Sequence, residues 1–415
     1  MRLFITLLSA LLFNAAWLDF YSSWLVIPSF LLLFILFKKI DRPACVYGFV
    51  WGVIVFCFHF HWLAQSLIKH GSCSMLLTGA LLFPLIMYCS FLTGMWFFAM
   101  QWVSRWTRVL IIPVSVVFWY LFDAYGLVPF GMGMGYPFIN PLLPLVRYRC
   151  FLAALSFFIG SVPVSHDTTE LVKRLHFVPP VVNRAWCYGE AWTGCPYAVV
   201  HRLHKQILRG VEHNAVLVSP ESTVLFFLNK HEALIKTLCP AKSDQLTYIL
   251  GSLRQNNDRI EQVAYCLQSG LIIKTYVKKI LVPFAEQTPP AWQWLQGLRR
   301  RLSSGYAECV AGDNNTAADE HFYIAECSVR PALCLEFFEQ PVRALCSART
   351  DAIMALVNDS WYTPLFREWL FLLAVLKSHV SGLLVVYIGH FGCYTIEPKN
   401  HSITQARSCY ASLHA

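Results

Sequence analysis

Residues 330–337 read Arg-Pro-Ala-Leu-Cys-Leu-Glu-Phe, a short apolar run that contains a cysteine near its end. The pattern predicts a buried strand that delivers Cys334 at its end, with the carboxylate of Glu336 two residues on, before the chain enters a helical run. A cysteine in that position is a candidate nucleophile. Cysteine is also among the residues most often buried for packing alone, so this stretch by itself leaves a structural role open.

Two other predicted strand ends carry chemically active side chains. Residues 214–222 read Asn-Ala-Val-Leu-Val-Ser-Pro-Glu-Ser, an apolar strand followed by Glu221. Residues 276–286 read Tyr-Val-Lys-Lys-Ile-Leu-Val-Pro-Phe-Ala-Glu, which places Lys278 just before a hydrophobic strand. The three strand ends therefore offer a carboxylate, an ammonium and a thiol, in the chain order Glu, Lys, Cys. This set favours nucleophilic catalysis by Cys334.

Each of the three groups suits one task in acyl transfer. A thiol attacks as the thiolate, so Cys334 needs a base or a cation nearby. Glu221 can accept the thiol proton and later return one to the leaving group. Lys278 supplies a fixed positive charge where the tetrahedral oxyanion develops. Lys279 is the competitor for that role, but adjacent strand residues point to opposite faces, so only one of the two lysines faces the site.

The local sequences around these residues resemble a known family. The matching segments are Pro-Glu-Ser at 220–222, Tyr-x-Lys-x-x-Leu-Val-Pro-Phe-x-Glu at 276–286, Cys-x-Glu at 334–336 and Leu-Val-Asn-Asp-Ser-Trp at 356–361. Together they resemble the nitrilase superfamily and, within it, the apolipoprotein N-acyltransferase family of bacterial envelopes. The resemblance covers nearly the whole chain, because that family also places a bundle of membrane helices ahead of its nitrilase-like domain.

The resemblance implies roles for further residues. Its Tyr-x-Lys register selects Lys278 rather than Lys279 and predicts that Lys279 is exposed on the opposite face. Glu286 and Glu336 match family carboxylates that orient the lysine and the cysteine segment, although the sequence alone also allows loop or surface acids. Trp192 matches a family tryptophan that contacts acyl chains.

Composition divides the chain into two parts. Hydrophobic residues make up 56% of the 415 positions and charged residues only 14%, which is too apolar for an ordinary soluble protein. Residues 1–165 hold nine Lys or Arg and three Asp or Glu, whereas residues 166–415 hold 24 and 21, so the net charge of +9 splits into +6 and +3. Basic loops beside apolar runs are typical of membrane spans, and a nucleic-acid partner is not predicted because the polar part has no basic stripe. We expect a helical membrane domain over 1–165 and a catalytic domain over 166–415.

The apolar part predicts several membrane spans. The apolar runs are 3–17, 24–37, 44–68, 74–103, 109–122 and 150–163. Residues 126–145, rich in Gly and Pro, predict an apolar loop at the membrane surface or a plain connector. Six crossings from a cytoplasmic N-terminus would leave the polar part inside, whereas the resemblance places it on the periplasmic side. Either the run at 150–163 does not cross, or the loop at 126–145 adds a crossing, or the chain is a shortened, inactive copy.

The polar part predicts an α/β fold. Strand-like segments lie at 214–219, 246–253, 263–268, 271–276, 280–284, 321–327, 330–336, 351–357 and 383–388, and helical or loop stretches such as 200–211 and 364–381 separate them. This alternation is typical of α/β proteins. The resemblance implies the specific form, an α-β-β-α nitrilase-like sandwich of two sheets with helices outside.

The resemblance also implies an activity and its partners. A fatty acyl group would move from a phospholipid to the amino group of the N-terminal diacylglyceryl-cysteine of an apolipoprotein, through a thioester on Cys334. The enzyme would span the bacterial inner membrane among its lipids, with the catalytic domain on the periplasmic side. No metal or organic cofactor is required, and the cysteine and histidine spacings do not suggest zinc.

Two alternatives remain open at the level of sequence. A membrane-anchored carbon–nitrogen hydrolase would use the same three residues on a small amide, although an amidase has no need of the membrane part. A decayed, non-catalytic copy is favoured by Leu335, because the family usually has tyrosine after the nucleophile, and by two family spans that have no counterpart among the apolar runs.

Overall fold

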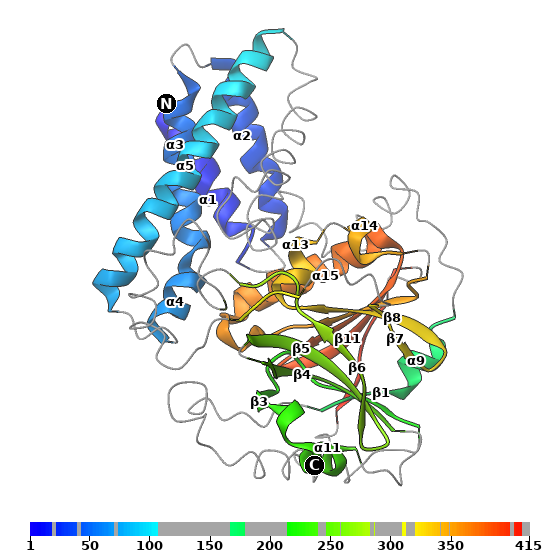
Figure 1. Cartoon of the computed structure of the whole chain (residues 1–415). Helices are drawn as coiled ribbons and strands as arrows, with labels where there is room; N and C mark the ends of the chain where they lie inside the picture. The colour runs from blue at the N-terminus through cyan, green and yellow to red at the C-terminus, as the bar shows by residue number, and fades with distance from the viewer. Residues whose placement is uncertain are drawn as a thin grey trace, which may run out of the picture. The chain divides into compact units, whose positions relative to one another are not determined.

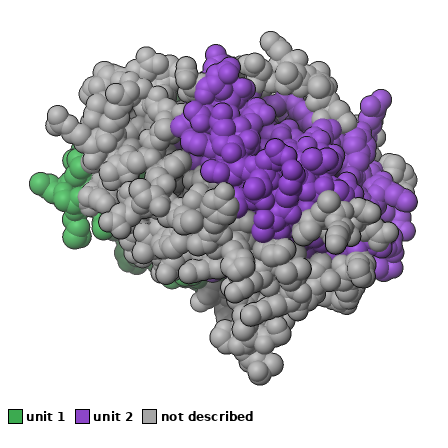
Figure 2. All heavy atoms as spheres, turned by 60° about the horizontal axis from the view of Figure 1, so that its bottom comes forward, with its two compact units in different colours: residues 1–151, 362–373 green, residues 152–361, 374–415 purple. Residues whose placement is uncertain are grey.

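The computed structural model forms two compact units, residues 1–151 with 362–373 and residues 152–361 with 374–415 (Figures 1 and 2). The residues it describes are 1–18, 22–39, 43–69, 74–106, 167–178, 214–239, 246–257, 259–282, 286, 309–312, 320–340, 342–347, 349–398 and 402–408. The predicted domain boundary at 165–166 lies outside these ranges, as do Trp192 and the predicted helix at 200–211.

The first unit is helical. Its described elements are α1 (Arg2–Ala15), the short 3-10 helix η1 (Ser23–Leu25), α2 (Val26–Lys39), α3 (Ala44–His59), α4 (His61–Lys69) and α5 (Met75–Trp106). Within the described ranges, only Met75–Ser104 is long and apolar enough to cross a membrane. The predicted span at 44–68 is wrong as a single helix, because the chain breaks at Phe60 between α3 and α4. The runs at 109–122, 126–145 and 150–163 lie outside the described residues.

Small residues let the helices α3 and α5 approach closely. A Cβ atom added at Gly52 would lie 2.1 Å from Thr93 Oγ1, and one added at Gly48 would lie 2.6 Å from the Phe97 ring. The Thr93 hydroxyl donates to the Gly48 carbonyl at 3.0 Å, so a polar contact fastens the apolar interface. Such small-residue contacts are typical of helices that pack in lipid.

The second unit contains two mixed β-sheets. The first has the order β13-β1-β2-β4-β5-β6, with β3 also paired to β4; the second has the order β12-β11-β10-β9-β8-β7. The strands of the first sheet are β1 (Leu175–Phe177), β2 (Val216–Val218), β3 (Val224–Phe227), β4 (Thr247–Asn256), β5 (Arg259–Gln268), β6 (Leu271–Val277) and β13 (Arg407–Ser408). Those of the second are β7 (Phe322–Ile324), β8 (Cys327–Leu333), β9 (Ala352–Leu356), β10 (Leu384–Gly389), β11 (Gly392–Glu397) and β12 (Ser402–Gln405).

The two sheets share one hydrophobic core, which confirms the predicted α/β class. The inner face of the first sheet, with Val218 and Ile249, packs in one buried cluster with Val329 and Met354 of the second. On the outer face of the first sheet, helix α11 (Glu232–Leu238) buries its apolar side chains in a second cluster. The further described helices of this unit are α9 (Thr169–Arg174), α13 (Leu335–Glu339) and α14 (Val342–Leu345). Two short 3-10 helices are η5 (Leu228–Lys230) and η7 (Asp359–Trp361). Helix α15 (Pro364–Ser381) begins in the first unit and ends in this one.

Most of the predicted strands are present, and one is wrong. The apolar segment 280–284 is not a strand over its described residues, 280–282, which form a bend followed by residues without regular structure. The turn is closed from both sides by Glu286, whose backbone N–H donates to the Val282 carbonyl at 2.8 Å and whose Oε2 accepts the Val282 N–H at 2.7 Å. Apolar side chains predicted a strand, but a carboxylate that returns to the backbone produces a turn.

Gly251 on β4 gives a direct test of how closely the first sheet approaches the segment that carries Glu221. A Cβ atom at Gly251 would lie 2.5 Å from Glu221 Cα and 2.8 Å from the Pro220 carbonyl oxygen, and backbone cannot move away as a side chain can. We therefore expect Gly251→Ala to lower the free energy of unfolding by about 1–3 kcal/mol, measured by thermal unfolding of the purified chain in detergent. Gly79→Ala is the control, since no atom lies within 4 Å of its added Cβ. Equal unfolding midpoints for Gly251→Ala and the unmodified protein would contradict the close approach.

Candidate active site

Three chain segments of the second unit bring the predicted site residues together. Glu221 follows β2 by three residues, Lys278 follows β6 directly and Cys334 follows β8 directly. The backbone of Lys278 is fixed on both sides, because its N–H donates to the Gln262 carbonyl and its carbonyl accepts the Gly312 N–H, each at 2.9 Å. Glu221 and Lys278 come from the first sheet and Cys334 from the second, so the packing of the two sheets brings the three segments together.

A buried ammonium between two carboxylates forms the centre of the site. Lys278 Nζ lies 2.8 Å from Glu221 Oε1 and 2.8 Å from Glu286 Oε1. The Lys278 side chain is fully buried, and both glutamates are buried. Burial opposes the charge of Lys278, but the two carboxylates more than offset this and raise its pKa well above the usual value. The lysine is therefore a permanent cation at this position.

Cys334 occupies a strained elbow between β8 and α13. Its backbone has φ +43° and ψ −112°, outside the regions that side chains other than glycine favour. The Cys334 N–H donates to the Leu356 carbonyl on β9 at 2.8 Å, and its carbonyl accepts the Phe337 N–H at 3.0 Å. The elbow thus turns the thiol out of the strand direction, and such strain is found most often at functional positions.

The pKa of the Cys334 thiol depends on the neighbouring Glu221 carboxylate. Burial raises the pKa of the thiol and the nearby Glu221 carboxylate raises it further, while Lys278 and the backbone N–H of Asn358 lower it. Burial likewise raises the pKa of Glu221, against the opposing effects of Lys278 and of the hydrogen bond from Cys334. The resting cysteine is therefore a neutral thiol beside the Glu221 carboxylate. Nucleophilic attack from this arrangement requires proton transfer to Glu221.

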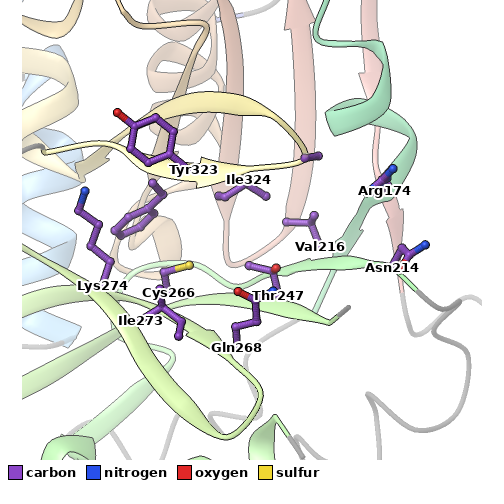
Figure 3. A pocket seen from close by; sticks show the side chains of 12 residues that line it. Arg174, Asn214, Val216, Thr247, Cys266, Gln268, Ile273, Lys274, Tyr323 and Ile324 are labelled. Carbon is purple, nitrogen blue, oxygen red and sulfur yellow. The ribbon is translucent and has the colours of Figure 1, made fainter. Parts of the chain in front are cut away.

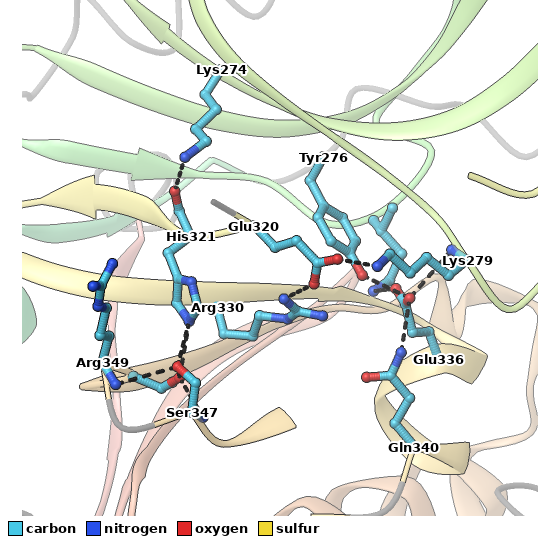
Figure 4. A network of polar contacts seen from close by, with 12 residues as sticks. Lys274, Tyr276, Lys279, Glu320, His321, Arg330, Glu336, Gln340, Ser347 and Arg349 are labelled. Carbon is cyan, nitrogen blue, oxygen red and sulfur yellow. Dashed lines mark hydrogen bonds and ion pairs between the residues drawn. The ribbon is translucent and has the colours of Figure 1, made fainter. Parts of the chain in front are cut away.

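Glu336 holds the cysteine elbow to the end of β6 (Figure 4). Its Oε1 accepts hydrogen bonds from Tyr276 Oη at 2.7 Å, from the Lys279 N–H at 3.2 Å and from Gln340 Nε2 at 3.1 Å. Its Oε2 accepts the Leu333 N–H at 3.2 Å. The carboxylate is fully buried, so the surface-acid interpretation of Glu336 is wrong. Burial raises the pKa of Glu336, and the donors around it lower it.

Lys279 points away from this centre but is not exposed as predicted. Its ammonium pairs with Glu320, which also pairs with Arg330, and the Lys279 side chain is only 15% exposed (Figure 4). The guanidinium of Arg330 in turn lies 5.6 Å from the centroid of the Tyr276 ring. Lys279 therefore belongs to a network beside the site, and its backbone N–H, rather than its side chain, contacts Glu336.

Two further residues contact the backbone of the site. Lys377 on α15 donates to the carbonyls of Phe337, Phe338 and Gln340 at 2.5, 2.8 and 2.8 Å, which caps the C-terminal end of the short helix α13. His390 Nε2 donates to the Glu221 carbonyl at 3.1 Å, and burial lowers the pKa of His390 to about 4, so the ring is neutral. Because these contacts go to backbone carbonyls, side-chain patterns in the sequence could not reveal them.

The backbone of His390 makes a further contact. Its backbone N–H donates to Asp359 Oδ1 at 2.6 Å, and a Cβ at Gly389 would lie 2.3 Å from Asp359 Oδ2. Asp359 belongs to the Asn-Asp-Ser-Trp segment and Gly389 to the late strand β10. The sequence signal for this contact was the Asn-Asp-Ser-Trp motif itself, although its partner was not predicted.

Comparison with solved structures gives matches that cover part of this chain. Similar chains include a glutamine-dependent NAD+ synthetase from Acinetobacter baumannii in complex with ADP, with 13% identity, a TM-score of 0.38 and coverage of 52% of this chain and 41% of the other. A glutamine-dependent NAD(+) synthetase from Cytophaga hutchinsonii has 9% identity, a TM-score of 0.34 and coverage of 52% and 38%. A CN-hydrolase superfamily protein from Xanthomonas campestris, solved with an arsenic adduct in its active site, has 11% identity, a TM-score of 0.33 and coverage of 56% and 83%.

The match spans about two fifths of the length of each synthetase. Comparison with curated proteins gave no match. Residues 9–148 match the family model described as the apolipoprotein N-acyltransferase N-terminal domain. The match agrees with the family recognised from the motifs at 220–361, and it covers about a third of the chain: residues 9–148 are similar to the N-terminal domain of that family.

Replacing Lys278 tests the buried ion cluster. In Lys278→Met the carboxylates of Glu221 and Glu286 lose their cation, and breaking a buried ion pair in this way destabilises a protein by about 3–5 kcal/mol. Burial already raises the pKa of Glu221, and loss of the lysine cation, which lowers it, raises it further. The folded variant therefore binds more protons than the unfolded chain, and its stability falls as pH rises. We expect the drop in unfolding midpoint to be larger at pH 8 than at pH 5.

Lys279→Met is the matched control for this measurement. Glu320 keeps Arg330 as a partner, and the Lys279–Glu320 pair is partly exposed, so we expect a loss of no more than about 1 kcal/mol. Equal losses in the two variants, or a loss in Lys278→Met that is the same at pH 5 and pH 8, would contradict the structure of the cluster.

Proposed function

We propose that this chain is an apolipoprotein N-acyltransferase that works through a thioester on Cys334. The observation that carries the proposal is the buried Glu221–Lys278–Glu286 cluster in contact with the Cys334 thiol, in a chain that matches this family's N-terminal domain. The family implies lipid and lipoprotein substrates. The donor is then a phospholipid, and the acceptor is the amine of an N-terminal diacylglyceryl-cysteine.

The first step forms the acyl-enzyme. As Cys334 Sγ attacks the ester carbonyl carbon of the phospholipid, the thiol proton passes to Glu221, which already accepts a hydrogen bond from the thiol. Negative charge develops on the carbonyl oxygen, and the fixed cation of Lys278 stabilises it. When the tetrahedral intermediate collapses, the C–O bond to the glycerol oxygen breaks and Glu221 protonates that oxygen. A lysophospholipid leaves, and the acyl group remains on Cys334.

The second step transfers the acyl group to nitrogen. The neutral amine of the lipoprotein attacks the thioester carbonyl, Glu221 accepts the amine proton, and Lys278 again stabilises the oxyanion. The C–S bond breaks, and Cys334 leaves as a thiolate that Glu221 reprotonates. The products are an amide and the original thiol. Water is the competing nucleophile, so apolar surroundings that exclude water favour the amide over hydrolysis.

The supporting residues have positioning roles in this proposal. Glu286 fixes the lysine ammonium and closes the turn after it. Glu336 fixes the elbow of Cys334 through four hydrogen bonds. Two come from strands β6 and β8, and two from Lys279 and Gln340, which follow β6 and α13. Trp192, outside the described residues, is proposed to contact the acyl chain. Further parts of the proposal are a location in the bacterial inner membrane, several membrane spans and a periplasmic catalytic domain.

The two adjacent lysines give a sharp test of this mechanism. Lys278 lies in the cluster beside Cys334, and Lys279 pairs with Glu320, so only the first can act on the oxyanion. Loss of one preorganised oxyanion stabiliser lowers the rate by about 100-fold to 1,000-fold. We expect the rate of lipoprotein N-acylation to fall to this extent in Lys278→Met and to stay near normal in Lys279→Met. The rate is measured in membranes at matched protein level.

Cys334→Ser is the negative control for this assay. Cys334→Ser should give no transfer, because a serine hydroxyl is far less acidic than a thiol. Near-normal activity of Lys278→Met together with loss in Lys279→Met would move the assignment to Lys279 and contradict the proposed mechanism. Absence of transfer in the unmodified protein, tested with both lipid and lipoprotein present, would favour the decayed copy.

A further inference from the structure

Gln262 on β5 lies directly opposite Lys278. In the register of β5 and β6, Ala264 lies opposite Tyr276, and two residues further the Lys278 N–H donates to the backbone carbonyl of Gln262 at 2.9 Å. Side chains alternate between the two faces of a sheet, so Gln262 shares its face with Ala264, which packs in the core between the sheets. Directly opposite residues in an antiparallel pair have their Cβ atoms about 5 Å apart on one face. The Gln262 side chain is therefore a neighbour of the Lys278 side chain.

The side-chain amide of Gln262 is buried without a partner in the described part of the fold. The residue is 3% exposed, and within the described ranges its Oε1 has no hydrogen-bond partner. The Lys278 ammonium donates to Glu221 and Glu286 instead. Buried polar groups are almost always paired, and an unpaired one destabilises the fold. An unpaired acceptor beside the reacting groups is one that a substrate can fill.

The second step of the proposed reaction supplies a hydrogen-bond donor of the right kind. The attacking primary amine has two N–H groups, and Glu221 accepts the proton of one of them. The other N–H stays on the nitrogen and becomes the N–H of the product amide. Glu286 is already occupied, because it accepts hydrogen bonds from Lys278 and from the Val282 N–H. Gln262 Oε1 is open to accept the second N–H of the amine.

We propose that Gln262 is a substrate-binding residue whose amide oxygen holds the attacking amine. As the nitrogen forms its bond to the thioester carbon, positive charge develops on it, one proton passes to Glu221 and the other strengthens its hydrogen bond to Gln262 Oε1. The carbonyl electron pair moves to the oxygen beside Lys278 and returns as the C–S bond breaks. The Cys334 sulfur leaves as a thiolate and takes the proton back from Glu221. A contact that strengthens in the transition state raises the rate of the step in which it forms.

This inference rests on the proposed acyl transfer and assigns Gln262 to its second step alone. The reacting ester of a phospholipid has no N–H or O–H group, so Gln262 Oε1 has no donor to accept from in the first step. Loss of the amide should therefore slow discharge of the acyl-enzyme and leave its formation unchanged.

The two steps are measured separately on the full-length protein in detergent. The protein is first incubated with a phospholipid that carries an isotope-labelled acyl chain, and the label on the Cys334 peptide is followed by mass spectrometry. A peptide with an N-terminal diacylglyceryl-cysteine is then added, and transfer of the label to its amine is followed. In Gln262→Met, which removes the amide and keeps an unbranched side chain, we expect unchanged formation of the adduct. Its discharge should be at least about tenfold slower, because a hydrogen bond to a group that gains charge is lost.

Thermal unfolding separates a substrate contact from a structural role. The amide has no partner in the described fold, so Gln262→Met should unfold at the same temperature as the unmodified protein or at a higher one. Gln262→Asn is a second variant, which keeps the amide but withdraws it by one methylene group. It should also slow discharge and leave formation unchanged.

Gln268→Met is the matched control. Gln268 ends the same strand, about 20 Å from Gln262 along β5, where it lines a separate pocket (Figure 3). This variant should form and discharge the adduct as the unmodified protein does.

Several results would overturn the inference. These are unchanged discharge in Gln262→Met, an equal slowing of both steps, a clear drop in its unfolding midpoint, or an equal slowing of discharge in Gln268→Met. All four are read against a labelled adduct on Cys334 in the unmodified protein. Absence of that adduct would contradict the proposed function, and this inference with it.

Discussion

The buried ammonium of Lys278 is the interaction on which the site depends. Removing an ion from water destabilises a fold by several kcal/mol, and only close partners of opposite charge offset this. Here two carboxylates, each 2.8 Å from the ammonium, provide the compensation, and they come from the segment after β2 and from the turn after β6. The cluster therefore forms only when the first sheet is paired and the turn at Glu286 is closed. The close approach of Gly251 to Glu221 belongs to the same constraint.

A second constraint holds the nucleophile. The positive φ of Cys334 costs about 1–3 kcal/mol for a residue with a side chain, so its surroundings must impose it. Helix α13 is fastened at both ends: Glu336 accepts hydrogen bonds from β6 and β8, and Lys377 donates to three carbonyls at the other end. With this short helix fixed, the thiol is directed at Glu221. Rigid support of this kind holds the reacting atoms in place, as efficient catalysis requires.

The sequence singled out three residues that the structure brings together, because the signals that marked them are local. Glu221, Lys278 and Cys334 each lie within three residues of a strand end, and alternation along β6 correctly turned Lys278 inward and Lys279 outward. The α/β class followed from the alternation of segments in the same way. The roles of these residues in acyl transfer remain proposals, since proximity gives the chemistry that is possible and not the reaction that occurs.

The features that the sequence did not predict depend on long-range or backbone contacts. The sequence did not indicate the role of Lys377, because its acceptors are backbone carbonyl groups about 40 positions away in the chain. The apolar segment at 280–284 predicted a strand, but Glu286 closes a turn on it. Hydropathy over 44–68 measured composition alone, and so could not show the break at Phe60. Strand alternation predicted that Lys279 is exposed. The sequence did not show its partner Glu320, which lies 41 positions further along the chain.

The most direct measurement is the mass of the peptide that contains Cys334 after incubation of the full-length protein with a phospholipid carrying an isotope-labelled long acyl chain. The account predicts a labelled acyl group on Cys334 that hydroxylamine removes, as expected of a thioester, and that a peptide with an N-terminal diacylglyceryl-cysteine discharges to an amide. Cys334→Ser should show no such adduct. No acyl adduct on Cys334, or an adduct that water discharges as fast as the amine does, would contradict the account.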